Sequence, residues 1–355
     1  MAALKLRDRD AILTDEGIIF RVYGYSHPPD GYVCDVEYAP STIYESTNPK
    51  APRGPKEPSY YKFYADEGFQ FVDEEYPRYS IMYAPLEERF LGVRLSDIAE
   101  VRRPNEEYAR LIVEQPPNDL LKAMQNVSKL IISNSNLSES DFGVFGSILH
   151  GFHHPRFSDL DLIVYGRGKL ETLRQTLREI YREGSLRNEF ESEAALAGKC
   201  WRFANYDPEE FLWHQKRKEI YAYLDDENSG RVIKMEFEPV KCWNEIWNEY
   251  GSYRKITREG WIKAIARVVD DADAPFIPSI YQVELIRLLA CMPNVEDLRR
   301  VLSYVEEFRL QVRRDEEVYV EGNVERVETL TDTFYQITLT HGPRYYEQTL
   351  KVLNR

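Results

Sequence analysis

The chain has 355 residues, of which 43% are hydrophobic and 30% charged, and its formal net charge is −14. This composition is typical of a folded globular protein and excludes a disordered chain. The negative total provides no overall positive field toward nucleic acid or membranes, although a local basic groove would still bind phosphates. The four cysteines form no CxxC pair, so we expect neither a disulfide framework nor a cysteine zinc site. The sequence contains no apolar signal segment and no 18-residue apolar run, so we expect a cytoplasmic protein with no membrane partner.

Residues 1–110 predict a β-rich N-terminal domain. Two segments rich in β-branched and aromatic residues, 17–25 and 31–39, flank the turn sequence SHPPD and predict a hairpin. The aromatic segment 59–76 predicts further strands of the same sheet.

A proline-rich segment, 47–59, interrupts this domain. Proline at this density does not pair in a sheet, so the segment predicts an extended exposed loop. Its prolines alternate with basic residues, which leaves two interpretations open: a solvated linker, or a basic arm that contacts phosphates. The basic residues are Lys50, Arg53 and Lys56.

Residues 111–250 predict a small α/β domain, because helical and strand periodicities alternate along them. Helical spacing of apolar residues covers 118–132, 169–184 and 207–224, the second ended by Gly184 and the third begun by Asp207. Strand patterns cover 143–147, 158–166 and 230–240.

Residues 251–355 predict a C-terminal α+β domain that ends in a small β-barrel-like unit. Strand patterns occupy 260–271, 316–330, 334–340 and 345–353, and helical patterns occupy 283–290 and 294–312. The fold class we expect is therefore α+β multidomain, with a central α/β domain between two β-rich parts.

Carboxylates on two apolar strands are the main chemical signal. Asp159 and Asp161 share one face of a strand, because successive side chains of a strand point to opposite sides. Glu236 and Glu238 share one face of another strand in the same way. Neighbouring carboxylates repel, and a hard divalent cation such as Mg²⁺ removes that repulsion. Carboxylates from two strands are also able to hold two ions for phosphoryl displacement.

A Gly-Ser pair and a loop precede the aspartates. Gly146 lets a phosphate approach the backbone, and Ser147 is placed to cap a short helix and offer its hydroxyl to an anion. In the loop, Arg156 is suited to pair with a triphosphate oxygen. His150 begins a histidine cluster with three interpretations: a loop that contacts phosphate or base, a zinc site, and a loop that is merely polar. The other two histidines are His153 and His154.

These residues resemble a known family. A helix, a strand that ends in Gly146-Ser147, a loop and Ser-Asp-Leu-Asp-Leu-Ile-Val resemble the nucleotidyltransferase fold of the DNA polymerase beta superfamily. The whole chain is also similar to archaeal predicted nucleotidyltransferases. The resemblance implies that Gly-Ser grips the triphosphate of a nucleoside triphosphate (NTP), and that two Asp and a third carboxylate bind two Mg²⁺ ions. Glu236 stands three residues before Pro239, where the family's third carboxylate often stands relative to a proline. Glu238 is the second choice for this third metal ligand.

The sequence departs from the family at two positions. The third carboxylate is a glutamate where aspartate is usual, and His150-Gly151 stands where Arg-Gly is usual. With Asp159, Asp161 and Glu236 as catalytic residues, the resemblance implies an enzyme that moves a nucleoside monophosphate (NMP) from an NTP to an acceptor hydroxyl and releases pyrophosphate. We expect the acceptor to be an RNA or DNA end. The alternatives are transfer to a protein or small molecule, and a nucleic-acid-binding module whose transferase site is vestigial.

Overall fold

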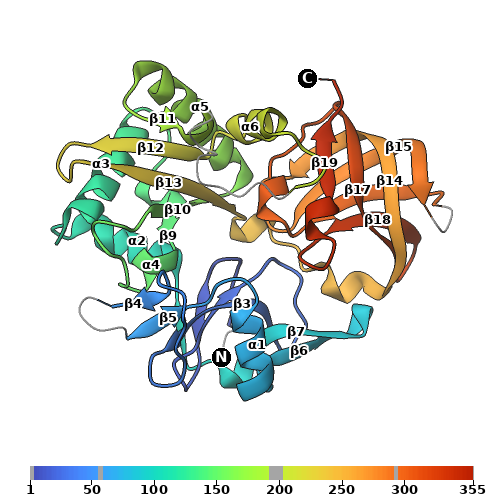
Figure 1. Ribbon diagram of the computed structural model, residues 1–355, viewed down its shortest axis with the longest axis horizontal. Coiled ribbons are helices and arrows are strands. Elements are labelled where there is room, and N and C mark those ends of the chain that lie inside the picture. The colour runs from blue at the N-terminus through green and yellow to red at the C-terminus, as the bar shows by residue number, and fades with distance from the viewer. Residues whose placement is uncertain (1–3, 55–58, 192–202, 292–294, 355) are drawn as a thin grey trace. The chain divides into compact units, whose positions relative to one another are not determined.

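A computed structural model describes residues 4–54, 59–191, 203–291 and 295–354 (Figure 1). The chain folds as two compact units. The first unit comprises residues 1–83, 87–187 and 222–248, and the second comprises 84–86, 188–221 and 249–355. The first unit contains both the N-terminal sheet and the central sheet. The division into three domains at residues 110 and 250 therefore stays a prediction.

The first unit begins with an eight-stranded sheet of order β4-β5-β3-β2-β1-β8, to which β7 attaches through β3 and β6 through β7. Strands β2 and β3 pair antiparallel, which confirms the predicted hairpin. The strands are β1 (Ala11–Leu13), β2 (Ile19–Val22), β3 (Gly31–Pro40), β4 (Pro52–Arg53), β5 (Tyr60–Lys62), β6 (Ser80–Tyr83), β7 (Glu88–Arg94) and β8 (Glu100–Arg102).

Two N-terminal predictions were wrong. Part of the proline-rich segment forms β4 and pairs with β5, because it uses the carbonyls of Ala51 and Arg53 as acceptors and the proline nitrogen is not needed. Residues predicted as strand form helix α1 (Glu67–Glu75), whose buried residues Gly68, Phe71 and Val72 follow helical spacing. Residues 55–58, which include Lys56, lie outside the described residues.

The central sheet of the first unit has the order β11-β12-β13-β10-β9. Its strands are β9 (Phe142–Val144), β10 (Leu160–Tyr165), β11 (Arg187–Asn188), β12 (Tyr221–Asp226) and β13 (Arg231–Val240). Strand β10 runs parallel to β13 and antiparallel to β9. Four helices accompany the sheet: α2 (Pro104–Val113), α3 (Asp119–Ser133), α4 (Gly146–Leu149) and α5 (Arg167–Glu183).

The two long helices follow their sequence signals. The Asn118 side chain accepts a hydrogen bond from Leu121 N and caps α3, and Gly184 ends α5 in the left-handed conformation. The apolar faces of both helices are buried as their spacing predicts. Figure 1 shows α3 and α5 beside the central sheet, with α5 in contact with β10. The face of β10 and β13 that carries Asp161 and Glu236 also carries a small apolar cluster of Ile163, Tyr165 and Val240.

The helix predicted over 207–224 is shorter in the structure. Helix α6 (Pro208–Lys216) begins at the Asp207 cap, as predicted. The chain turns at Glu219, which has a φ of 56°, and then enters strand β12. An apolar strand that follows a helix directly cannot be separated from it by composition, which is why the prediction ran too far.

The second unit is built on a six-stranded sheet: β14 (Tyr253–Asp273), β15 (Ser279–Cys291), β16 (Leu298–Ser303), β17 (Glu317–Thr329), β18 (Thr333–Leu339) and β19 (Thr349–Val352). The helices predicted over 283–290 and 294–312 were wrong, because these segments form most of β15 and β16. Long antiparallel pairing with β14 outweighs the helical spacing in β15. Asn294, the first residue of the second predicted helix, lies outside the described residues.

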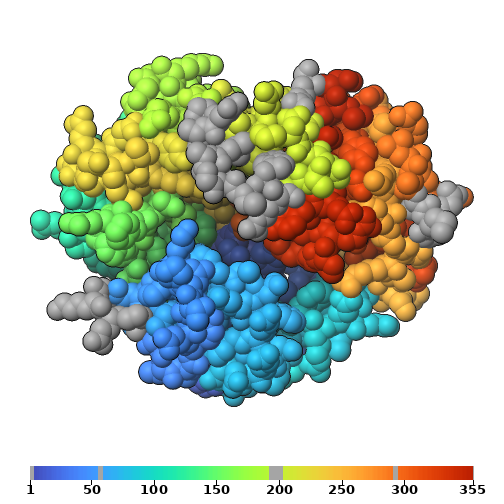
Figure 2. Space-filling view, viewed as in Figure 1, coloured from blue at the N-terminus to red at the C-terminus, as the bar shows by residue number. Residues whose placement is uncertain are grey.

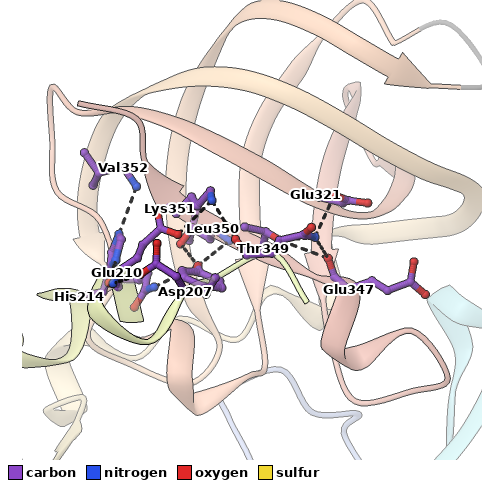
Figure 3. Close-up of polar contacts among 12 residues, drawn as sticks. Asp207, Glu210, His214, Glu321, Glu347, Thr349, Leu350, Lys351 and Val352 are labelled. Atoms are coloured by element: carbon purple, nitrogen blue, oxygen red, sulfur yellow. Dashed lines mark hydrogen bonds and ion pairs between the residues drawn. The ribbon is translucent and has the colours of Figure 1, made fainter. Parts of the chain in front are cut away.

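Helix α6 belongs to the second unit through polar contacts with β19 (Figure 3). His214 Nε2 accepts a hydrogen bond from Val352 N at 3.2 Å, and Lys351 Nζ lies 3.1 Å from Glu210 Oε2. These contacts tie the segment between β11 and β12 to the C-terminal sheet. In the part of the chain that the structure describes, no helix is both long and apolar enough to span a membrane.

Candidate active site

Asp161 and Glu236 are neighbours in the structure. Strands β10 and β13 are parallel, and their register places Asp161 directly opposite Glu236. Residues directly opposite in paired strands point to the same side of the sheet. The next pair on this face is Ile163 and Glu238. The structure therefore brings together one carboxylate from each of the two predicted strands.

The surroundings of Asp161 disfavour a bare negative charge. Burial raises the pKa of Asp161 to about 7. Lys62 and Lys234 oppose that rise in pKa, whereas Asp159 and Glu238 add to it. A group of negative side chains in a partly dry position is stabilised by an added cation.

Asp159 is exposed and lies immediately before β10. Two hydrogen bonds to Ser158 fix the chain directly before Asp159. Arg231 Nη2, at the start of β13, donates to the Ser158 carbonyl oxygen at 2.5 Å, and the Ser158 hydroxyl accepts from His154 N at 2.8 Å. The loop that carries Asp159 is thus attached to the same strand that carries Glu236.

Gly146 lies against the Asp161 carboxylate. Its φ is +60°, and a Cβ added at this position would lie 3.0 Å from Asp161 Oδ2. The backbone N–H of Phe145 donates to the Asp161 carbonyl oxygen at 3.1 Å, which fixes the approach of the Gly-Ser segment. Ser147, half-buried in the first turn of α4, follows directly. Glycine is needed here for both its conformation and its lack of a side chain.

Glu238 has a different environment from Glu236. Its side chain is buried, and its Oε2 lies 3.0 Å from Nη2 of Arg9, in the turn that precedes β1. Glu238, the second candidate for the third metal ligand, is therefore paired with Arg9.

The carboxylates fit a hard divalent cation in their chemistry, because carboxylate oxygens are the ligands that Mg²⁺ prefers. Among the described residues, however, no three His, Cys, Asp or Glu side chains gather closely enough to hold a metal ion. Asp161 and Glu236 are brought together, and the predicted three-carboxylate group stays a proposal. The residues that would complete it are Asp159, Asp161 and Glu236.

His150 lies in the core, with its Nε2 4.0 Å from Glu37 Oε2. Its ring is buried and packs edge-on against Tyr38, with 5.4 Å between the ring centroids. Its Nδ1 lies 3.3 Å from Nη1 of Arg102. Burial lowers the pKa of His150 to about 3, so the ring is neutral. A buried neutral ring has no surface left for a nucleotide, and we assign it a packing role.

The remaining loop residues point to separate partners. His153 Nε2 lies 3.1 Å from Asn118 Nδ2, whereas His154 Nδ1 accepts from the backbone N–H of Arg156. The three histidines thus do not form the zinc site that was one interpretation of their spacing. The Arg156 residue is exposed on the loop surface.

Lys62 is a cation near Asp161 whose position the sequence did not reveal. It lies on β5 opposite Tyr38, and Tyr60 of the same strand packs on Phe152, with 4.6 Å between ring centroids. In Figure 2 the blue surface of the N-terminal sheet meets the green surface of the segment after α4. Strand β5 therefore brings Lys62 toward Asp161. Only the pairing of distant segments creates this proximity, so no local pattern signals it.

Comparison with known proteins agrees with this geometry. Residues 127–244 match the family described as nucleotidyltransferase domain, a range that contains Gly146, Ser147, Asp159, Asp161 and Glu236. The chain therefore carries a nucleotidyltransferase domain of the kind expected, and the protein is a transferase enzyme of that class.

The chain is also similar to an uncharacterized protein of the archaeon Methanocaldococcus jannaschii. The two are 24% identical over 337 residues, which cover 91% of this chain and 92% of the relative. The similarity includes the N-terminal and C-terminal parts as well as the matched domain. No solved structure matches the chain.

Proposed function

We propose that this protein is a Mg²⁺-dependent nucleotidyltransferase that moves NMP from an NTP to the hydroxyl of an RNA or DNA end. The single observation that carries the proposal is the pair Asp161 and Glu236, set opposite each other on parallel strands with Gly146 against Asp161. Carboxylates beside a glycine backbone combine a site for cations with a place where a phosphate chain is able to approach.

Asp159, Asp161 and Glu236 would hold two Mg²⁺ ions. When bound, these ions supply charge neutralisation for the triphosphate and the leaving pyrophosphate. The other roles belong to the chain itself. The Gly146 backbone and the Ser147 hydroxyl bind the phosphates, and Arg156 pairs with them from the loop surface.

Lys62 would add a positive charge to the phosphate side of the site. It approaches from the N-terminal sheet, on the strand that pairs with β4. Lys50 lies beside β4 and Arg53 lies in it, with Arg53 Nη1 donating to the Lys50 and Pro52 carbonyl oxygens, so the basic residues of β4 and β5 are on neighbouring strands. Basic residues on neighbouring strands suit the phosphate backbone of a nucleic-acid acceptor. They support the choice of an RNA or DNA end over a protein or small molecule.

The C-terminal strands complete the proposed architecture. Strand β14 pairs with β15 along one edge and with β17 along the other, and β17 also pairs with β18. We propose that these pairings make the small barrel-like unit expected from the sequence.

An acceptor screen tests the proposal. The full chain is incubated with Mg²⁺ and each of four α-labelled NTPs, and is offered single-stranded RNA, single-stranded DNA and a protein mixture. We expect label on the 3′ end of RNA or DNA and released pyrophosphate. Label on protein alone would overturn the choice of acceptor. Nucleic-acid binding without transfer under every NTP would favour a vestigial site.

A further inference from the structure

Arg9 is a buried arginine that contacts both the strand carrying Glu236 and the residue before Gly146. Its side chain is fully buried, and its Nη2 donates to Glu238 Oε2 at 3.0 Å. Its guanidinium also lies over the ring of Phe145, 5.6 Å from the centroid. Glu238 belongs to β13, and Phe145 directly precedes Gly146.

The two residues that Arg9 contacts lie next to the carboxylate pair. Glu238 lies two residues after Glu236 on the same face, and it is opposite Ile163, two residues after Asp161. Phe145, under the guanidinium, donates its N–H to the Asp161 carbonyl. One arginine is thus in contact with the strand that carries Glu236 and with the residue that fixes the Gly-Ser segment on Asp161.

The conformation of Arg9 is costly in itself. It has a φ of 72°, a region that residues other than glycine rarely adopt. Its charge is also taken out of water, which stability alone does not favour even when the charge is paired. A residue that combines backbone strain with a buried charge is costly, which indicates that its side chain has a positioning role.

A network of charges holds Arg9 in place. Asp8, also buried, lies 3.7 Å from Arg9 Nε and accepts from Gly24 N at 2.8 Å. Asp10 accepts from Arg7 N at 3.0 Å and lies 3.6 Å from Nη1 of Arg103. The sequence Arg-Asp-Arg-Asp at 7–10 therefore forms a buried support, with Arg9 as the residue that extends to β13.

We propose that Arg9 is a positioning residue for the metal-binding carboxylates. It commits Glu238 to an ion pair, keeps that side chain out of the metal ligands, and leaves Glu236 as the ligand that β13 supplies. This inference rests on the proposed function, because it assigns a role to Arg9 toward the ions of that site. It also gives the N-terminal sheet a part in the active site.

The test is Mn²⁺ binding to the full chain, measured by electron paramagnetic resonance and so independent of turnover. Because Arg9→Met removes a positive charge and frees the Glu238 carboxylate beside Glu236, we expect it to tighten Mn²⁺ binding at least tenfold at a temperature where the variant stays folded, and Arg9→Lys to stay close to wild-type affinity. The matched control is Arg21→Met, which removes an arginine that is paired with Asp35 at 2.9 Å on the same sheet. It should bind Mn²⁺ as wild type does.

Variants of Glu238 and Glu236 form a second part of the test. They remain informative if Arg9→Met does not fold. Glu238→Gln keeps a hydrogen-bond acceptor for Arg9 and should change Mn²⁺ affinity less than threefold, whereas Glu236→Gln should weaken it at least tenfold. A tenfold loss in Glu238→Gln, or wild-type or weaker affinity in a folded Arg9→Met, overturns the role of Arg9. Absence of Mn²⁺ binding by the wild-type chain overturns the proposed function itself, which separates the two failures.

Discussion

A methyl group at Gly146 would lie 3.0 Å from Asp161 Oδ2, closer than side-chain carbons normally approach. The first turn of α4 and the strand β10 therefore meet at a point where only glycine fits. This contact joins the two sequence motifs, Gly-Ser and Asp-x-Asp, into one site. It also makes the glycine a sensitive place to test the site.

We predict that Gly146→Ala lowers the rate of nucleotidyl transfer about 100-fold, because a shift of the Asp161 carboxylate by a fraction of an ångström misplaces the reacting groups. The positive φ adds a loss of stability of about 1 kcal/mol or more. Gly151→Ala is the matched control, since Gly151 has a φ of +69° and no atom within 4 Å of its added Cβ. Equal transfer rates in the two variants would contradict a special role for Gly146.

Lys62 should act on substrate binding. The variant Lys62→Ala is expected to raise the KM for the NTP about tenfold, with a smaller effect on kcat. The Lys62 charge attracts the phosphates equally in the bound substrate and in the transition state, so its loss weakens binding more than it slows the transfer step. Lys129→Ala removes an exposed lysine on α3 and serves as the control. Steady-state kinetics at two salt concentrations measure the effect, which should shrink at high salt. An unchanged KM in Lys62→Ala would remove this residue from the site.

Protonation of His150 should destabilise the first unit in acid. Burial holds the pKa of His150 at about 3, below the value near 6.5 of an unfolded histidine. The unfolded chain therefore binds the proton more tightly, and the stability from the neutral ring is complete above about pH 6.5 and falls as the pH drops toward 3. Between pH 7 and 4.5 the loss amounts to about 2 to 3 kcal/mol.

Urea unfolding of the full chain at these two pH values measures that loss, followed by a probe in the first unit. His150→Leu should reduce the difference between pH 7 and pH 4.5 by about 2 kcal/mol. His27 has a pKa lowered to about 4 by burial and will leave part of the pH dependence in place. His341→Leu, which alters an exposed residue, is the control. The same pH dependence in His150→Leu and wild type would contradict this account.

Replacing both Arg9 and Glu238 tests how much their ion pair contributes to the free energy of unfolding. Arg9→Met leaves Glu238 buried without its cation and should cost about 3 to 5 kcal/mol of unfolding free energy. The double variant Arg9→Met with Glu238→Gln should recover more than half of that loss, because the buried Glu238 charge is removed together with its cation and only Asp8, which also accepts from Gly24 N, has lost its Arg9 partner. Thermal and urea unfolding measure both values. Additive losses in the double variant would show that the two residues do not interact.

The local parts of the site were predictable from sequence, whereas its long-range parts were not. The period of two in each strand predicts that Asp161 and Glu236 each face one side, and the Gly-Ser pair predicts the turn before them. The register that places the two carboxylates opposite each other depends on how β10 pairs with β13. Arg9 and Lys62 come from another sheet, and no spacing within the central domain points to them.

The errors of prediction have two physical origins. Residues 283–290 have helical spacing but form a strand, since pairing with β14 decides their conformation. Aromatic residues around Phe71 suggest a strand but form α1, because their buried positions recur every three to four residues. His150 has the place of a loop residue in the sequence, and the core formed with Tyr38 buries it. For residues 283–290 and His150, contacts with distant residues outweigh local preference, whereas in α1 the helical spacing outweighs the aromatic composition.

The most direct test of the central claim compares wild type with Asp161→Asn in Mg²⁺-dependent transfer from an α-labelled NTP. Asparagine keeps the size of the side chain and removes the charge that the ions need, so the fold should persist while transfer falls about 1000-fold. Circular dichroism and thermal unfolding of both proteins establish that the variant is folded. We predict labelled nucleic-acid ends with wild type and almost none with Asp161→Asn. Equal labelling by the two proteins would contradict the assignment of the active site.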